Sequence, residues 1–223
     1  MSYYDEEGDH QMEVWLDQYL ENELERLSKE AAFNFLAHNG DAIEARVRQC
    51  LADANALRDI GFAAASLVSA VVGIEVTIRF FLLQPLLQGA FLSREWAALL
   101  TQRIIRPRSA EDRDLLPAIL RNWGVDITRF TLPSGEQLWE SIVVQVWPAR
   151  NRYIHQADTV AMVETKVAVE CLQTLLHHVV TRVAHELGFT RDKTNKWSVV
   201  ATDSSVSPAD LNPPRQFVEE SPF

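Results

Sequence analysis

The chain has 223 residues, of which 47% are hydrophobic and 23% charged, and a formal net charge of −10. This length and composition are those of a globular protein that can bury a sizeable core. The net negative charge argues against a broad, nonspecific DNA-binding protein, whose affinity depends on an excess of basic residues.

The charge is unevenly distributed along the chain. Residues 1–30 hold ten acidic residues against Arg26 and Lys29, a net charge of −8 that leaves −2 for the rest. Between residues 94 and 152 the basic residues are nine arginines, which face seven acids. A slightly positive middle region is compatible with a phosphate-bearing partner despite the overall acidity.

The sequence favours a cytoplasmic protein with no membrane partner. Cys50 and Cys171 are isolated, so neither a zinc site nor a disulfide framework is expected. The acidic residues 1–7 do not resemble a signal peptide. The apolar stretch 60–74 stops at Glu75 and Arg79 and is too short for a membrane span, so we expect a buried core helix.

Residues 10–37 are predicted to form an amphipathic helix, because apolar residues recur at steps of three and four. Its other face is acidic. That face is either the solvated side of a packed helix or a shield that covers the arginines when no substrate is present. Asn39-Gly40 is expected to end this helix, and a capping box at 41–44 to begin a second one that runs to about residue 58.

The next segment, 62–83, is apolar nearly all round and is predicted to be the central helix. Glu75 and Arg79 are spaced for an ion pair with each other; alternatively, one of them supports a cluster around Arg150. Pro85 and Gly89 are expected to mark the exit from this helix.

Further helices are predicted at 94–105, from Ser109 to Gly124, after the capping-box form at 134–137, and at 160–187, with a loop at 125–134. We therefore expect an all-α bundle in three parts: an acidic amphipathic N-terminal helix at 1–40, a helical bundle at 41–188 and an irregular tail at 189–223.

The segment Arg150-Asn151-Arg152-Tyr153-Ile154-His155 lies ahead of the last long helix. Asn151 and His155 are four residues apart and share a helical face. Arg150 and His155 are about 140° apart on a continuous helix, so their convergence requires a helix that starts, ends or distorts here, or a partner chain. Pro148 supplies a reason for a break.

These residue types suit the cleavage of RNA. Arginine offers a planar, permanently charged fork for phosphate oxygens, and histidine transfers protons near neutral pH. The 2′-hydroxyl of RNA lies beside the scissile phosphate and serves as the nucleophile. Such a reaction requires no metal and no cofactor.

The motif, followed by a long final helix, resembles the HEPN superfamily, whose members carry Arg-x4-6-His. The small-residue-rich segment 63–75, which ends in Glu75, resembles an early helix of that family, and the likeness covers about residues 41–188. The resemblance implies a helical bundle that forms a homodimer and acts as a metal-independent endoribonuclease, as a toxin or as an anti-phage or RNA-processing effector. It makes Arg150 and His155 catalytic, with Asn151 assisting.

Other members of that family bind protein or nucleotide partners without cleaving anything, so a non-catalytic module is the alternative. The expected partners are RNA, a second copy of the chain and an antitoxin or regulatory protein. Arg152 and Tyr153 are candidate substrate-binding residues; Tyr153 either stacks on a base or packs within the protein. Some toxins of the family carry a tyrosine two residues after the histidine, where this chain has Ala157.

Overall fold

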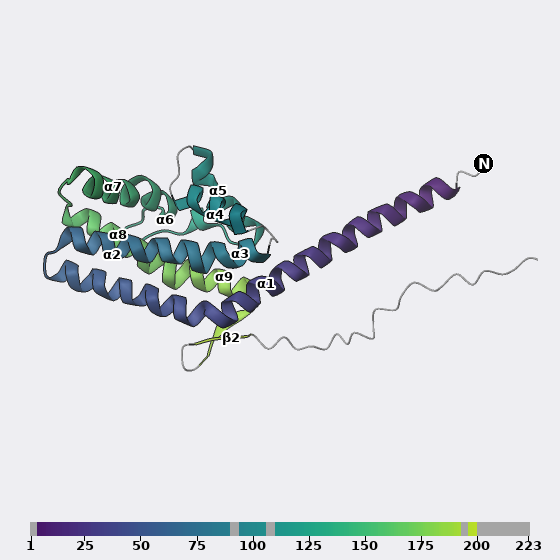
Figure 1. The fold of residues 1–223 in the computed structure, drawn as a ribbon, viewed down its shortest axis with the longest axis horizontal. Helices are drawn as coiled ribbons and strands as arrows, with labels where there is room; N and C mark the ends of the chain where they lie inside the picture. Colours follow the sequence, from purple (N-terminus) through teal and green to yellow (C-terminus); the bar gives the residue numbers. More distant parts are fainter. Residues whose placement is uncertain (1–3, 90–93, 106–109, 193–195, 200–223) are drawn as a thin grey trace, which may run out of the picture.

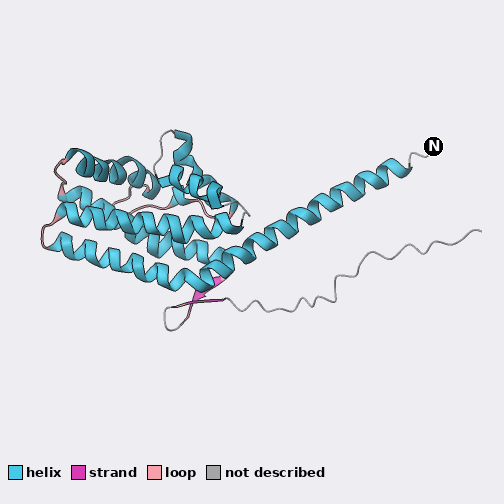
Figure 2. Cartoon of the chain, in the orientation of Figure 1, coloured by secondary structure: helices cyan, strands magenta, loops and turns pink. Residues whose placement is uncertain are grey.

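The computed structural model describes residues 4–89, 94–105, 110–192 and 196–199. Over these residues the chain is an all-α helical bundle with one short pair of strands, which confirms the expected fold class (Figure 1, Figure 2). The α-helices are α1 (Tyr4–Asp59), α2 (Ala63–Val76), α3 (Gln84–Gly89), α4 (Arg94–Ile105), α5 (Ala110–Asn122), α6 (Leu138–Glu140), α7 (Trp147–Gln156), α8 (Met162–Thr174) and α9 (Val180–Glu186). The strands are β1 (Phe189–Arg191) and β2 (Trp197–Val199).

Three π-helical segments join these helices into longer rods. They are Thr77–Leu83 between α2 and α3, Ser141–Val146 between α6 and α7, and Leu175–Val179 between α8 and α9. The second half of α1 lies beside the α2–α3 rod, which in turn contacts α7 and α8 (Figure 1). Helices α4 and α5 pack together beside this bundle.

The prediction that a helix ends at Asn39-Gly40 is wrong, because α1 is continuous from Tyr4 to Asp59. The side-chain amide of Asn39 donates to the carbonyl of Phe35 at 2.9 Å, within the helix instead of at its end. Gly40 is buried, and the ring of Trp197 lies against it. A glycine inside a helix costs about 1 kcal/mol, which the packing of the flanking turns offsets.

Small residues allow the central helix α2 to approach its neighbours closely. A Cβ atom at Gly73 would lie 2.6 Å from Leu172 Cδ2 of α8 and 3.1 Å from Cys50 Cβ of α1. The hydroxyl of Ser66 donates to the carbonyl of Ala54 at 2.6 Å. These contacts explain why small residues occupy positions 66 and 73 of α2.

Both prolines within the long rods follow a π-helical segment. The amides of Gln84 and Trp147, which precede Pro85 and Pro148, donate to the carbonyls of Arg79 and Ile142, five residues back. The wide turn accommodates a ring that would clash with the backbone of a regular α-helix. Of the two residues expected to mark the exit from this helix, Pro85 lies inside it and Gly89 is where it ends.

The segment Ala63–Leu83 is long and apolar enough to cross a membrane by length and composition, and it is the one such helix among the described residues. It is 61% buried inside the bundle, as expected for the core helix of a globular domain.

The start of the expected irregular tail is ordered. Strands β1 and β2 pair antiparallel, with Thr190 opposite Ser198, and the Phe189 ring stacks on Phe33 of α1 with centroids 4.6 Å apart. Residues 200–223 of the expected tail lie outside the described residues. Residues 189–191 and 197–199 are therefore regular strands where an irregular tail was expected, because three-residue strands are too short to show a periodicity.

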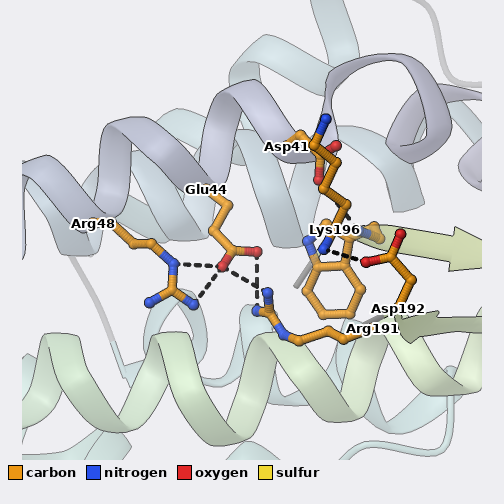
Figure 3. Close-up of polar contacts among 7 residues, drawn as sticks. Asp41, Glu44, Arg48, Arg191, Asp192 and Lys196 are labelled. Atoms are coloured by element: carbon orange, nitrogen blue, oxygen red, sulfur yellow. Dashed lines mark hydrogen bonds and ion pairs between the residues drawn. The ribbon is translucent and has the colours of Figure 1, made fainter. Parts of the chain in front are cut away.

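An ion cluster fastens this hairpin to α1 (Figure 3). The buried carboxylate of Glu44 accepts from Arg48 Nε at 2.7 Å and from Arg191 Nη2 at 2.9 Å. Burial alone would raise the pKa of the Glu44 carboxyl, but hydrogen bonds from Arg191 and Arg48 outweigh it and lower that pKa. The Arg191 guanidinium also lies over the Trp197 ring, 4.1 Å from its centroid.

The first half of α1 extends away from the bundle as a single helix (Figure 1). We call residues 4–30 the arm. Burial within α1 begins at Ala32 and Leu36, whereas the apolar side chains described in the arm are exposed. The packing expected for the helix at 10–37 is therefore found only in its last turns, and in this structure the arm does not cover the bundle.

Candidate functional site

The Arg150–His155 motif lies on α7, which continues from α6 through the π-helical segment Ser141–Val146. The expected break at Pro148 is absent because this proline lies in the first turn after the wide segment. The helix ends at Gln156, and Ala157 closes it in the left-handed conformation with φ 55°. The motif is thus carried on one rigid, continuous helix.

A cleft of about 1090 Å³ lies between α7 and the helices opposite it. From α7 it is lined by Trp147, Pro148, Arg150, Asn151, Ile154 and His155. The other lining residues are Glu75, Leu99, Gln102, Arg103, Ile105, Asp112, Arg113 and Val143. The three residues expected to be catalytic, Arg150, Asn151 and His155, therefore line the same cleft.

Arg150 and His155 reach this cleft without a distortion of the helix between them. The six lining residues of α7 lie on one broad face of the helix, which spans about 160°, with Arg150 at one edge and His155 and Pro148 at the other. A cleft of this size contacts the whole arc. Arg150 and His155 therefore share the cleft without a break in the helix between them.

The guanidinium of Arg150 is held by two oxygen atoms. Its Nη1 donates to Asn151 Oδ1 at 3.0 Å, and its Nη2 lies 3.8 Å from the Glu75 carboxylate of α2. Arg150 and Glu75 are about three-quarters buried. Asn151 therefore orients Arg150, and Glu75 supports the Arg150 cluster, which was one of the two roles expected for it.

No ion pair between Glu75 and Arg79 occurs among the described residues; Arg79 lies over the Phe80 ring instead. The helix becomes π-helical at Thr77, which changes the angle between the two positions and removes the expected alignment of residues four apart. Glu75 therefore contacts Arg150 of α7 in place of Arg79 on its own helix.

The imidazole of His155 is exposed and makes no hydrogen bond to another group in the described part of the chain. Its ring is thus open to a ligand in the cleft. An exposed histidine in the same cleft as an arginine can transfer a proton to or from a bound phosphate ester.

The opposite wall adds further charge. Arg103 of α4 and Arg113 of α5 line the cleft, and Arg103 Nη1 lies 3.8 Å from the Asp112 carboxylate. With Arg150, the lining holds three guanidinium groups against the two carboxylates of Glu75 and Asp112. The cleft thus has a net positive charge before His155 is counted, which favours an anionic ligand.

Arg103, Asp112 and Arg113 were not singled out from the sequence. The signal that points to the two arginines is the exclusive use of arginine as the basic residue between residues 94 and 152. Trp147 was also missed as a cleft residue; its Nε1 is buried and has no hydrogen-bond partner in the described structure.

The two candidate substrate-binding residues do not line the cleft. Arg152 pairs with Glu164 at 2.6 Å and lies 3.9 Å from Asp158, so it ties α7 to the start of α8. Tyr153 is 37% exposed, and its backbone carbonyl accepts the amide of Ala157. The structure therefore separates these two residues from Arg150, Asn151 and His155.

Comparisons of the chain with protein-family models, with curated proteins and with solved structures found no match.

Proposed function

We propose that the cleft binds a ribose–phosphate segment of RNA and that the protein is a metal-independent endoribonuclease of the HEPN type, acting in the cytoplasm as a toxin or as an anti-phage or RNA-processing effector. One observation carries the proposal: Arg150, Asn151 and His155 line a single positively charged cleft, with Arg150 held by Glu75 and Asn151. The two free thiols, Cys50 and Cys171, support a reducing compartment.

In the proposed reaction the imidazole of His155 takes the proton of the 2′-hydroxyl. The 2′-oxygen forms a bond to phosphorus, and the bond from phosphorus to the 5′-oxygen breaks. Arg150 stabilises the charge that develops on the non-bridging phosphate oxygens. The leaving 5′-oxygen takes a proton from the imidazole of a second copy, as a homodimer would supply, and the product ends in a cyclic phosphate.

The alternative is a non-catalytic module that binds a nucleotide or a protein in the same cleft. The 3.8 Å contact between Arg150 and Glu75 favours it, because this contact joins α2 to α7 and so gives Arg150 a structural role that requires no chemistry. In this alternative His155 contacts the ligand but transfers no proton.

The test compares the wild type with Arg150→Ala, His155→Ala and Arg152→Ala. Arg152 is a matched control, because it lies on the same helix but outside the cleft. Purified proteins are incubated with a fluorescent RNA and with the same RNA carrying a single 2′-deoxy position. We expect cleavage of the first substrate, and a loss of about 100-fold or more in Arg150→Ala and His155→Ala.

Arg152→Ala should cleave within about threefold of the wild type, since a half-exposed ion pair contributes mainly to stability. Thermal unfolding of all four proteins shows whether any loss of activity is a loss of fold. A wild type that binds a nucleotide but leaves RNA intact would overturn the enzyme proposal and favour the binding module.

A further inference from the structure

The arm carries a patch of large apolar side chains that nothing in the described structure covers. Met12, Trp15, Leu16, Tyr19 and Leu20 are between 47% and 64% exposed. We call these five residues the arm patch. They lie within about 140° of the helix circumference, and the rings of Trp15 and Tyr19 stack with centroids 5.5 Å apart.

A helix in this situation lacks the usual source of its stability. Isolated helices are marginal in water, and most helices in proteins are stabilised by packing of their apolar face. Contiguous apolar patches on an otherwise soluble protein mark interaction sites. Trp and Tyr are also residues that contribute strongly to binding, because they bury a large area with little loss of side-chain entropy.

The charge of the arm selects the partner. Residues 1–30 have a net charge of −8. Arg26, one of the two basic residues of that segment, is already paired with Glu23 at 2.9 Å and lies 3.5 Å from Glu30. Two arms packed against each other would bring two such acidic segments together, which is unfavourable. A basic partner would neutralise them.

We propose that the arm patch docks a basic amphipathic helix of another protein. Its aliphatic face packs on Trp15, Leu16 and Tyr19, and its lysine and arginine residues pair with the carboxylates of the arm. The mode is that of a helix pair, in which the apolar contacts supply affinity and the charges select the partner. It does not depend on the cleft or on its activity.

The probe is a synthetic amphipathic helix of about 20 residues, with leucine on one face and lysine on the other. Its binding to the full chain is measured by fluorescence anisotropy. A peptide with glutamate in place of lysine and a scrambled leucine–lysine peptide are the comparisons. We expect the basic amphipathic peptide alone to bind, and its affinity to fall as salt rises from about 0.05 to 0.5 M.

The decisive variant is the double substitution Leu16→Gln and Leu20→Gln, which removes apolar surface and leaves the charge unchanged. Its matched control is Val163→Gln, at a 66% exposed position of α8 in the bundle. We expect at least tenfold weaker binding to the double variant and a change of less than about twofold in the control.

Equal binding by the double variant would overturn the proposal, because nonspecific attraction of a cationic peptide to an acidic chain would then suffice. Equal binding of the scrambled peptide would overturn it as well. A dimer detected by light scattering and lost in the double variant would assign the arm patch to a second copy and also overturn it. A dimer that persists in the double variant forms through a surface other than the arm patch. Such a result therefore bears on the homodimer of the proposed reaction and not on the arm patch.

Discussion

The carboxylate of Glu75 lies 3.8 Å from the guanidinium of Arg150 and links the central helix α2 to α7 at the edge of the cleft. Because both side chains are about three-quarters buried, the contact limits the directions in which Arg150 can point. In the proposed reaction Glu75 is therefore a positioning residue, which acts on the substrate only through Arg150.

Glu75→Gln should lower the cleavage rate about tenfold, equivalent to roughly 1.4 kcal/mol of transition-state stabilisation. The free energy of unfolding should change by less than about 1 kcal/mol, as expected for a partly exposed pair. Single-turnover cleavage and urea unfolding measure the two effects. Glu140→Gln, at an exposed position of α6 outside the cleft, is the control. Wild-type rates in Glu75→Gln would show that Arg150 needs no such support.

Gly73→Ala should destabilise the bundle by about 1–3 kcal/mol, since the added Cβ meets Leu172 at 2.6 Å and Cys50 at 3.1 Å. Urea unfolding followed by circular dichroism measures the difference. Val72→Ala changes an exposed position one residue earlier on α2 and should shift stability by no more than about 0.5 kcal/mol. A Gly73→Ala variant as stable as the wild type would mean that α2 and α8 can separate at little cost.

Glu44→Gln should be less stable than the wild type by about 2 kcal/mol at neutral pH, because two charge-assisted hydrogen bonds weaken. The pKa of Glu44 is lowered by folding, so its contribution is complete above the unfolded value of about 4.3 and is lost as pH falls through the folded value. The difference in Tm between the two proteins should therefore shrink below about pH 4. A difference that stays constant to pH 3 would contradict the role of an ionised Glu44.

Ala157→Gly should stabilise the protein by about 0.5–1 kcal/mol, because Ala157 closes α7 with a φ of 55° that glycine adopts without strain. Ala161→Gly is the control, since Ala161 has an ordinary φ of −76° and glycine relieves no backbone strain there. Thermal unfolding compares the three proteins. Destabilisation by Ala157→Gly would show that the flexibility added to the unfolded chain outweighs the relieved strain.

The helical character of the chain could be predicted because the apolar residues of each core helix repeat at steps of three and four. The ends of the helices were less predictable. Asn39-Gly40 has the local features of a helix end, but packing against the hairpin residue Trp197 overrides them. The hairpin itself depends on Glu44 and Arg191, which are far apart in the sequence, and no local pattern links them.

Only the part of the cleft that α7 contributes could be predicted from the sequence. Arg150, Asn151 and His155 form a local motif on one helix. Arg103, Asp112 and Arg113 lie on α4 and α5, and no local sequence pattern links these helices to α7. Their placement across the cleft from α7 is known only from the three-dimensional structure. The separation of about 140° between Arg150 and His155 could be predicted, but the breadth of the cleft that both residues line could not.

Because α1 is one uninterrupted helix, it fixes the rotation of the arm patch about the helix axis relative to the bundle and its cleft. Deleting one residue near position 31 would turn Trp15 and Leu16 by about 100° about the rod axis, whereas deleting seven would shorten the arm and turn them by only about 20°. The number of residues in this stretch therefore determines the direction in which a partner docked on the arm patch faces the bundle.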